Sequence, residues 1–214
     1  MGNLSGTRTT GVLLAAGAGN RLGMGPKALL PYRGRPLVEA IADALLDGGC
    51  REVVVVLGAG ASHVTETAEL GRCRTVVNRA WPSGMGGSFL LGAATADPGD
   101  HLLVALVDQP GLTGDTVGRL LAAHRPGRIT AAAYDKAQAG AQAGPARRGL
   151  RRGHPLLIDA TLRAAVGSTV KGDAGARLFL QAHPELVDEV DCSDQSSGED
   201  IDTPEQLYLL WQRP

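Results

Sequence analysis

The stretch from Gly11 to Lys27 constrains the fold more than any other part of the sequence, because a strand pattern runs directly into a ligand-binding pattern there. The apolar run 12–16 is typical of a strand covered on both faces. It ends in a loop with glycines at positions 17, 19, 23 and 25. Glycines at this density let backbone N–H groups approach a ligand closely, and Arg21 and Lys27 add positive charge. The stretch therefore predicts the opening strand of an α/β sheet, followed by a phosphate-binding loop.

The spacing of these glycines differs from that of two common nucleotide-binding motifs. A dinucleotide-binding fingerprint needs G-x-G-x-x-G or G-x-G-x-x-A and, about 20 residues later, a carboxylate for the ribose. Here Leu22 stands where the third glycine, or the alanine, of the fingerprint belongs. The next apolar run ends in Leu57-Gly58 without a carboxylate. A Walker loop would close with Gly-Lys-Ser or Gly-Lys-Thr, which this loop lacks. A nucleotide-binding loop of another kind is favoured, and an NAD(P)H-dependent oxidoreductase that uses Gly17, Gly19 and Gly23 stays open as an outside alternative.

Strand patterns and helix patterns alternate along the rest of the chain. Alternation of this kind is typical of βαβ units, and it predicts a three-layer α/β sandwich with a mainly parallel, Rossmann-like sheet. Ligands bind such sheets beyond the carboxyl ends of the strands. The expected strands are 11–16, 53–57, 74–77, 102–107, 129–134, 154–158 and 186–190. The expected helices are 37–48, 62–70, 88–96, 113–124, 174–181 and 203–211.

Length and composition restrict the classes of protein to consider. At 214 residues the chain is long enough for one α/β domain, and no linker-like segment divides it, so we expect a single domain over 1–214. A net charge of −1 and 3% aromatic residues argue against a nucleic-acid partner. No apolar run reaches the length of about 18 residues that a membrane span needs, and no secretory signal is apparent. A cytoplasmic protein with small-molecule partners is the expectation.

Segment 136–152 interrupts the alternation of strands and helices. Ala-Gln-Ala-Gly occurs twice in it, and arginines follow at 147, 148, 151 and 152. Such a low-complexity segment is expected to be a mobile loop. Its arginines are either a solvated charge run or a binding site for a ligand phosphate, and both readings stay open. Residues 1–10 are expected to form a flexible leader.

Two carboxylate positions are candidates for metal binding. Asp108 follows the apolar run 102–107, which places it on the same edge of the predicted sheet as the glycine loop. Asp202 lies between a short strand and a helix, in the run Asp200-Ile201-Asp202-Thr203-Pro204. An NTP reaction needs a hard cation, and Mg²⁺ prefers one or two carboxylates with phosphate oxygens and water. The alternative for Asp108 is a turn-capping role, and Asp200 is expected only to favour the N-terminus of the following helix.

Six motifs, in order along nearly the whole chain, resemble those of one known family. They are L-A-A-G-x-G-x-R-x-G-x-x-x-K at 14–27, N-R-A-W-P-S-G-M-G-G-S at 78–88, D-Q-P at 108–110, G-H-P at 153–155, G-D-A-G-A-R at 172–177 and D-I-D-T-P at 200–204. The set resembles the MobA/MocA-like molybdenum cofactor nucleotidyltransferases and is most similar to their cytidylyltransferase branch. The resemblance implies a nucleotide-diphospho-sugar transferase-like fold. It also implies Mg²⁺-dependent transfer of CMP from CTP to the phosphate of molybdopterin cofactor, with release of pyrophosphate. A guanylyltransferase, or a transferase for another phosphorylated acceptor, is the alternative within this fold.

The resemblance also implies roles for individual residues. The expected catalytic residues are Lys27, Arg21 and Asp108, and the expected metal ligands are Asp108 and Asp202. The expected nucleotide-binding residues are Leu14, Ala15, Ala16, Gly17, Gly19, Arg21, Lys27, Asn78, Gly84, Met85 and Ser88. The expected acceptor-binding residues are His154, Asp173 and Arg177. Ser88 and Asp173 are in addition expected to cap the helices that follow them.

Two departures from the family pattern fall in the second motif. Arg79 stands where proline is usual, and Gly86-Gly87 replaces a pair that is often serine, so backbone contacts to the nucleotide are expected there rather than side-chain contacts. The partners implied are an NTP and a phosphorylated acceptor such as molybdopterin, with no nucleic acid and no membrane. Delivery of the product to a molybdoenzyme or its chaperone is a further implication.

Overall fold

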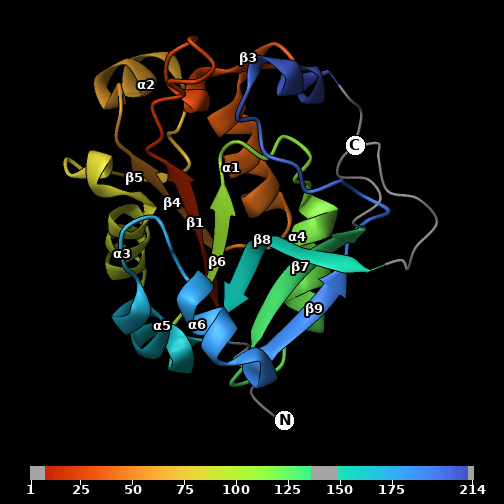
Figure 1. Cartoon of the computed structure of the whole chain (residues 1–214). Helices are drawn as coiled ribbons and strands as arrows, with labels where there is room; N and C mark the ends of the chain where they lie inside the picture. The colour runs from red at the N-terminus through yellow and green to blue at the C-terminus, as the bar shows by residue number, and fades with distance from the viewer. Residues whose placement is uncertain (1–7, 136–148, 212–214) are drawn as a thin grey trace.

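The apolar runs of the sequence form one seven-stranded sheet in a computed structural model of the protein, which describes residues 8–135 and 149–211 (Figure 1). Its strands, from edge to edge, are β5 (Arg74–Val77), β4 (Glu52–Leu57), β1 (Thr9–Ala15), β6 (His101–Leu106), β8 (Leu150–Ile158), β7 (Ile129–Asp135) and β9 (Val187–Asp191). Adjacent strands are parallel except on the two sides of β8, which runs antiparallel to β6 and β7. The predicted mainly parallel α/β sheet is confirmed.

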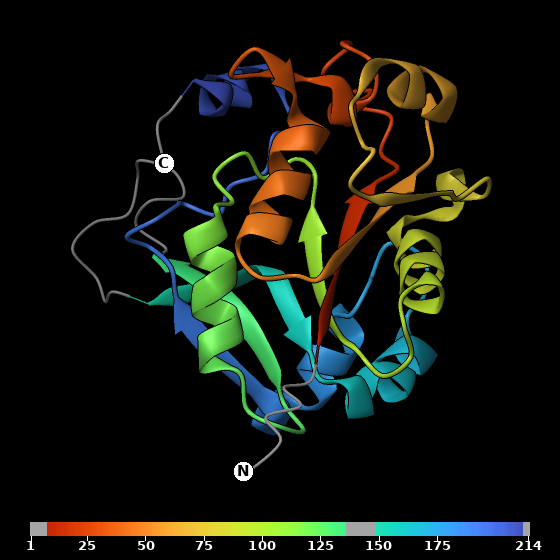
Figure 2. The ribbon, with the colours of Figure 1, turned by 180° about the vertical axis from the view of Figure 1, so that it is seen from behind.

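Helices cover both faces of this sheet, which gives the three predicted layers. Helices α1 (Leu37–Asp47) and α4 (Gly114–Ala123) lie in front of the sheet in Figure 2. Helices α3 (Met85–Thr95), α5 (Arg163–Thr169) and α6 (Arg177–Ala182) lie on the opposite face. Successive strand residues alternate between the two cores: Leu13 and Val55 pack toward α1, whereas Val12 and Val54 pack toward Phe89 of α3. Both faces of the central strands are therefore buried, as their unbroken apolar runs predict.

Three shorter pieces complete the edge of the sheet where the parallel strands end. Strands β2 (Pro31–Tyr32) and β3 (Arg35–Pro36) pair as a small antiparallel ribbon, and α2 (Ala61–Thr67) packs its Val64 into the α1 side of the core. The segment Pro204–Leu210 is a 3₁₀ helix, labelled η5 here, rather than the α-helix expected. It begins with the predicted capping box of Thr203 and Gln206. Within the described ranges, no helix combines the length and the apolar composition that crossing a membrane requires.

Several predicted boundaries were wrong for identifiable reasons. Strand β1 begins at Thr9, inside the expected leader, because the Thr10 hydroxyl donates to the buried Asp100 (2.8 Å) and fixes this end. Strand β8 begins at Leu150, inside the expected mobile loop 136–152. Helix α5 was not predicted, because the run 163–169 carries little apolar periodicity. The rest of the expected leader (1–7) and loop (136–148) lies outside the described residues.

The order of the strands fixes where a ligand can bind. From β1 the chain continues to β4 and β5 on one side, whereas β6 lies on the other side of β1. The loops that follow β1 and β6 therefore diverge at the carboxyl ends of two neighbouring parallel strands. Such a reversal of strand order is where open α/β sheets hold their ligands.

Candidate active site

The glycine loop after β1 folds back on itself and aims a lysine at the sheet. Gly19 has a φ of 65°, and a side chain there would collide with the Gly25 carbonyl group. Its carbonyl oxygen accepts hydrogen bonds from the N–H groups of Leu22 (2.9 Å) and Gly23 (3.3 Å), which close the turn. The chain then enters a three-residue 3₁₀ turn, η1 (Lys27–Leu29). This turn places the Lys27 side chain over the carboxyl ends of the strands.

Lys27 lies between the two predicted metal-binding carboxylates. Its Nζ donates to Asp108 Oδ2 (2.7 Å) and to Asp202 Oδ1 (2.6 Å). Burial disfavours the charged form of this lysine, but the two carboxylates outweigh that effect and raise its pKa, so the ammonium stays charged. The N–H of Ile201 donates to the Asp108 carbonyl oxygen (2.9 Å), which holds the two carboxylate segments together. The structure thus brings Lys27, Asp108 and Asp202 to one point from three distant parts of the chain.

A third carboxylate, Asp200, lies beside this pair, and its position was missed by the sequence analysis. Its Oδ1 accepts a hydrogen bond from Gln109 Nε2 (2.7 Å). Burial, and then the neighbouring negative charge of Asp108, raise the pKa of Asp200 to about 6. The Asp-Ile-Asp spacing was the available signal, because side chains two residues apart on an extended chain point to the same side.

A cavity of about 300 Å³ opens next to Lys27 and Asp108. Most of its wall consists of residues predicted to bind the nucleotide or to act in catalysis: Leu14, Ala16, Gly17, Lys27, Gly84, Met85, Ser88 and Asp108. Trp81, Pro82, Leu106, Val107 and Asp173 complete the lining. Ala15, Gly19, Arg21 and Asn78, also predicted, do not line it. We call this space the donor cavity.

One predicted residue that does not line the donor cavity, Asn78, orients a side chain that does. The buried Asn78 donates from its side-chain amide to Ser88 Oγ (3.0 Å) and accepts from the Ala80 N–H (3.0 Å), so it orients the serine. Ser88 lies inside α3 and does not cap it, because the helix begins three residues earlier than expected, at Met85. Ala15 is fully buried in the core on the α1 side of the sheet.

The early start of α3 has a long-range cause. The Asp173 carboxylate accepts a hydrogen bond from the Met85 N–H (3.1 Å), and the Gly172 carbonyl oxygen accepts one from the Gly86 N–H (2.7 Å). Asp173 therefore caps α3 and not the helix that follows it in sequence, as was expected. Gly84 makes this contact possible, since it has a φ of 116° and any side chain there would collide with Gly172.

A second cavity of about 410 Å³ adjoins the first, and we call it the acceptor cavity. Leu14, Met85 and Asp173 line both cavities. The apolar part of its wall includes Phe89, Leu156 and Leu180. Its polar part includes Gln109, Arg151, Arg152, His154, Arg177 and Asp200. All three residues predicted to bind the acceptor, His154, Asp173 and Arg177, thus lie around one space.

The polar groups of the acceptor cavity differ in their charge and in their partners. Burial lowers the pKa of His154 to about 4, so its imidazole is neutral near pH 7. Arg151 donates from Nη2 to the Gly198 carbonyl oxygen (3.0 Å), while its buried Nε has no hydrogen-bond partner among the described residues. Arg177 is exposed, and no ion pair within 8–135 and 149–211 engages it. These guanidinium groups are suited to an anionic ligand.

Comparison with known proteins shows to which family this chain belongs. A sequence model of the MobA-like NTP transferase domain matches residues 11–187. The chain belongs to the MobA-like NTP transferase family. It is thereby a nucleotidyltransferase by family, and five of the six motifs that predicted this relationship lie within the matched region.

Two curated relatives of this MobA-like protein carry different activities in their names. Nicotine blue oxidoreductase from Paenarthrobacter nicotinovorans is 61% identical over 210 residues, which cover 98% of this chain and 100% of that protein. Molybdenum cofactor guanylyltransferase from Xanthomonas euvesicatoria pv. vesicatoria (strain 85-10) is 30% identical over 207 residues, covering 94% of this chain and 93% of that protein.

Solved structures agree with the family assignment. Rv0371c from Mycobacterium tuberculosis H37Rv is 28% identical and matches with a TM-score of 0.78 over 96% of this chain and 99% of that one. A complex of Rv0371c with manganese matches with a TM-score of 0.75, at 26% identity, over 97% and 100% of the two chains. A nucleotidyl transferase from Methanothermobacter thermautotrophicus is 26% identical and has a TM-score of 0.75 over 97% and 95% of the two chains.

The carboxylates of this MobA-like protein are suited to a divalent cation. The ammonium of Lys27 already contacts one oxygen of Asp108 and one of Asp202, so the two side chains converge on a position that holds positive charge. Carboxylate oxygens are the ligands that hard divalent cations prefer. The structure does not bring Arg21 to this point: the side chain is exposed, lines neither cavity and forms no ion pair with a described residue.

Proposed function

We propose that this protein transfers CMP from CTP to the terminal phosphate of a molybdopterin cofactor and releases pyrophosphate, with Mg²⁺ as the metal. The observation that carries the proposal is the Lys27 ammonium held between Asp108 and Asp202, beside two adjoining cavities. A nucleotidyl transfer needs this combination, because two anionic substrates must meet with their charges neutralised.

The reaction needs no nucleophilic side chain. An oxygen of the acceptor phosphate attacks the α-phosphorus of CTP, the bond between this phosphorus and the α,β-bridging oxygen breaks, and pyrophosphate leaves with that oxygen. The glycine loop binds the triphosphate through its backbone N–H groups, and Lys27 stabilises charge on the transferring and leaving groups. Asp108 and Asp202 would hold Mg²⁺, which when bound neutralises charge on the phosphate oxygens. Arg151 and Arg177, which line the acceptor cavity, would hold the acceptor phosphate.

The choice of CTP and molybdopterin rests on the D-Q-P, G-H-P and D-I-D-T-P motifs, which look more like the cytidylyl than the guanylyl branch. The relative named as a guanylyltransferase supports GTP as the alternative donor. The acceptor cavity supports a flat heterocycle that carries a phosphate, since apolar side chains and guanidinium groups line it together. Such a reaction would take place in the cytoplasm, where NTPs are available, and its product would pass to a molybdoenzyme or its chaperone.

The test is to incubate the full chain with Mg²⁺, molybdopterin cofactor and each of the four NTPs in turn. We expect pyrophosphate release with CTP, only when the acceptor is present, together with a mass increase of one CMP on the acceptor. Lys27→Ala serves as the inactive control. Faster turnover with GTP would change the donor and leave the reaction class standing. No pyrophosphate with any NTP would refute the proposal.

A second candidate function is reduction of nicotine blue by NADH or NADPH. The observation that favours it is the 61% identity with nicotine blue oxidoreductase over almost the whole chain. Two structural features rank it second. The glycine loop enters the three-residue turn η1 instead of a helix that could receive a pyrophosphate, and β4 ends at Leu57 without a carboxylate for the ribose.

One further assay distinguishes the two candidate functions. The protein is mixed with nicotine blue and with NADH or NADPH, and the absorbance of the nicotinamide and of the dye is followed. We expect no oxidation of the nicotinamide above the rate without protein. Enzyme-dependent hydride transfer to the dye, together with a negative pyrophosphate assay, would assign the protein to the oxidoreductase function.

A further inference from the structure

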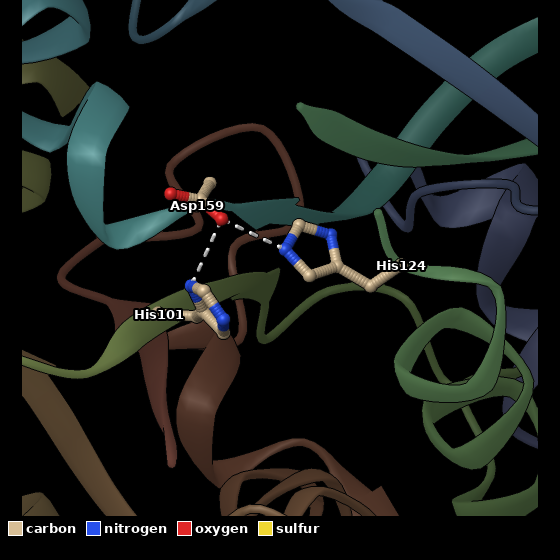
Figure 3. Close-up of side chains that lie close together, drawn as sticks. All are labelled: His101, His124 and Asp159. Carbon is tan, nitrogen blue, oxygen red and sulfur yellow. Dashed lines mark hydrogen bonds and ion pairs between the residues drawn. The ribbon is translucent and has the colours of Figure 1, made fainter. Parts of the chain in front are cut away.

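Three side chains that the proposed reaction does not use gather at the opposite end of the sheet. His101 is the first residue of β6, His124 follows α4, and Asp159 follows β8 (Figure 3). Asp108 follows the other end of β6, so the length of that strand separates this cluster from the candidate active site. The cluster is almost closed to solvent, with side-chain exposures of 12% for His101, 9% for His124 and 5% for Asp159.

The spacing of the three groups matches that of a metal site. One oxygen, Asp159 Oδ2, lies 3.6 Å from His101 Nδ1 and 3.3 Å from His124 Nε2. The three candidate ligand atoms all lie within 4.8 Å of one another. Ligands around a tetrahedral zinc ion with bonds of about 2.0 to 2.1 Å are about 3.3 Å apart. Two of the three separations are therefore close to those of a zinc site before any ion binds.

Two of the three candidate ligands are oriented by a neighbour on the side away from the others. Asp159 Oδ1 accepts hydrogen bonds from the N–H (2.9 Å) and the hydroxyl (2.6 Å) of Thr161, which leaves Oδ2 facing the two imidazoles. His124 Nδ1 contacts the hydroxyl oxygen of the buried Thr130 (3.0 Å), which leaves Nε2 facing Asp159. Hydrogen bonds of this kind orient the ligands in known metal sites.

Two of the candidate ligands, His101 and Asp159, are in the form that binds a metal ion. The Ala160 N–H donates to His101 Nδ1 (2.9 Å), so this nitrogen carries a lone pair and no proton. Burial and the neighbouring His124 lower the pKa of His101. Burial alone would raise the pKa of Asp159, but hydrogen bonds from Thr161 and from the Gly127 N–H lower it to about 2. A carboxylate and a neutral imidazole are ready to bind a cation without first losing a proton.

We propose that His101, His124 and Asp159 bind a zinc ion at the amino-terminal end of β6, with a water molecule as the fourth ligand. Two imidazole nitrogens and one carboxylate oxygen suit Zn²⁺, whereas Mg²⁺ prefers oxygen ligands throughout. Ala160 gives up its hydrogen bond to His101 when the ion binds. The ion joins the start of β6 to the ends of β8 and α4, and in this nearly closed position its role is to stabilise the fold.

The test is zinc binding by the full chain after treatment with a chelator. Excess Mg²⁺ is included so that it fills the carboxylate site around Asp108. Isothermal titration is expected to give one zinc ion per chain with a Kd of about 1 µM or lower. His124→Gln is expected to weaken this binding at least about tenfold and to abolish the rise in Tm that zinc causes. The matched control is His63→Gln, which removes an exposed histidine of α2 and should leave zinc binding and the rise in Tm unchanged.

Cobalt provides a readout that needs no variant. Co²⁺ bound by the unmodified chain should give the strong visible absorption of a tetrahedral site with nitrogen ligands. The proposal is overturned if zinc fails to bind, if His124→Gln and His63→Gln bind it equally well, or if the cobalt complex lacks these bands. The three residues would then be a hydrogen-bonded cluster only.

Discussion

Removing the ammonium of Lys27 should reveal both its electrostatic and its catalytic role. In Lys27→Ala, Asp108 and Asp202 lose the charge that lies 2.7 and 2.6 Å from their oxygens. Opposite unit charges about 3 Å apart attract by about 5 kcal/mol at an effective dielectric constant near 20. Breaking a buried pair costs about 3 to 5 kcal/mol, whereas exposed pairs contribute less than about 1 kcal/mol. Lys27 is 13% exposed but Asp202 is 47% exposed, so the case lies between these limits.

We therefore expect Lys27→Ala to lower the free energy of unfolding by about 1 to 3 kcal/mol in the absence of divalent cations. Added Mn²⁺ or Mg²⁺ should restore much of this loss, because the cation replaces the ammonium between the same two carboxylates. Turnover in the nucleotidyl transfer assay should fall about 10²-fold or more, the usual effect of losing one preorganised charge-stabilising donor.

The measurements for Lys27→Ala are urea unfolding with and without the metal, and the initial rate of pyrophosphate release. Arg21→Ala is the matched stability control, since it removes the same charge from the same loop without breaking an ion pair among the described residues. A Lys27→Ala protein that is as stable as Arg21→Ala and turns over within a few-fold of the wild type would refute the reasoning. The contacts of Lys27 with the two carboxylates would then matter neither for stability nor for turnover.

The remaining predictions concern the other charged groups of the candidate active site. Asp108→Asn and Asp202→Asn should each raise the Mg²⁺ concentration needed for half-maximal turnover. The double variant should lose less transition-state stabilisation than the sum of the losses in the two single variants; strict additivity would mean that the two residues do not share an ion. The native pKa of Asp200, about 6, exceeds the unfolded value of 3.8, so its contribution to stability falls as pH rises from about 4 to 6. Asp200→Asn should thus stabilise the metal-free protein by about 1 to 3 kcal/mol at pH 7 and not below pH 4, as urea unfolding at both pH values would test. Arg177→Ala should raise the KM for the acceptor about tenfold without changing that for CTP, and an unchanged acceptor KM would exclude a phosphate contact.

Site features that directly follow a strand in the sequence could be predicted from the sequence. The glycine loop and Asp108 each follow an apolar run, and the alternation of strands and helices puts the ends of those runs on one edge of the sheet. The extent of β8 could not be predicted in this way. Arg151 and Arg152 are the second and third residues of the strand. Their guanidinium groups bond the Gly198 carbonyl oxygen and the Glu189 carboxylate, which no local pattern encodes. A run of arginines after a repeat looks like a loop until these distant partners are known.

The role of Asp173 shows the same limit within the site. Its place before a predicted helix favoured local capping, yet its carboxylate caps a helix 88 residues earlier in the chain. Capping patterns describe neighbours in sequence, and the loop 172–173 is close to α3 only because Gly84 leaves room for the contact. Asp200 was undervalued for a related reason, since Gln109, which bonds it, comes from the loop after β6.

The wall that Leu14, Met85 and Asp173 contribute to both cavities has a consequence for the order of events in a catalytic cycle. In the proposed reaction donor and acceptor would occupy adjoining spaces, so that the attacking phosphate and the phosphorus that receives it could lie side by side. Nothing has to be stored on the protein between two half-reactions, and no substrate has to leave before the other enters. Steady-state kinetics should accordingly be sequential, with a ternary complex, rather than ping-pong.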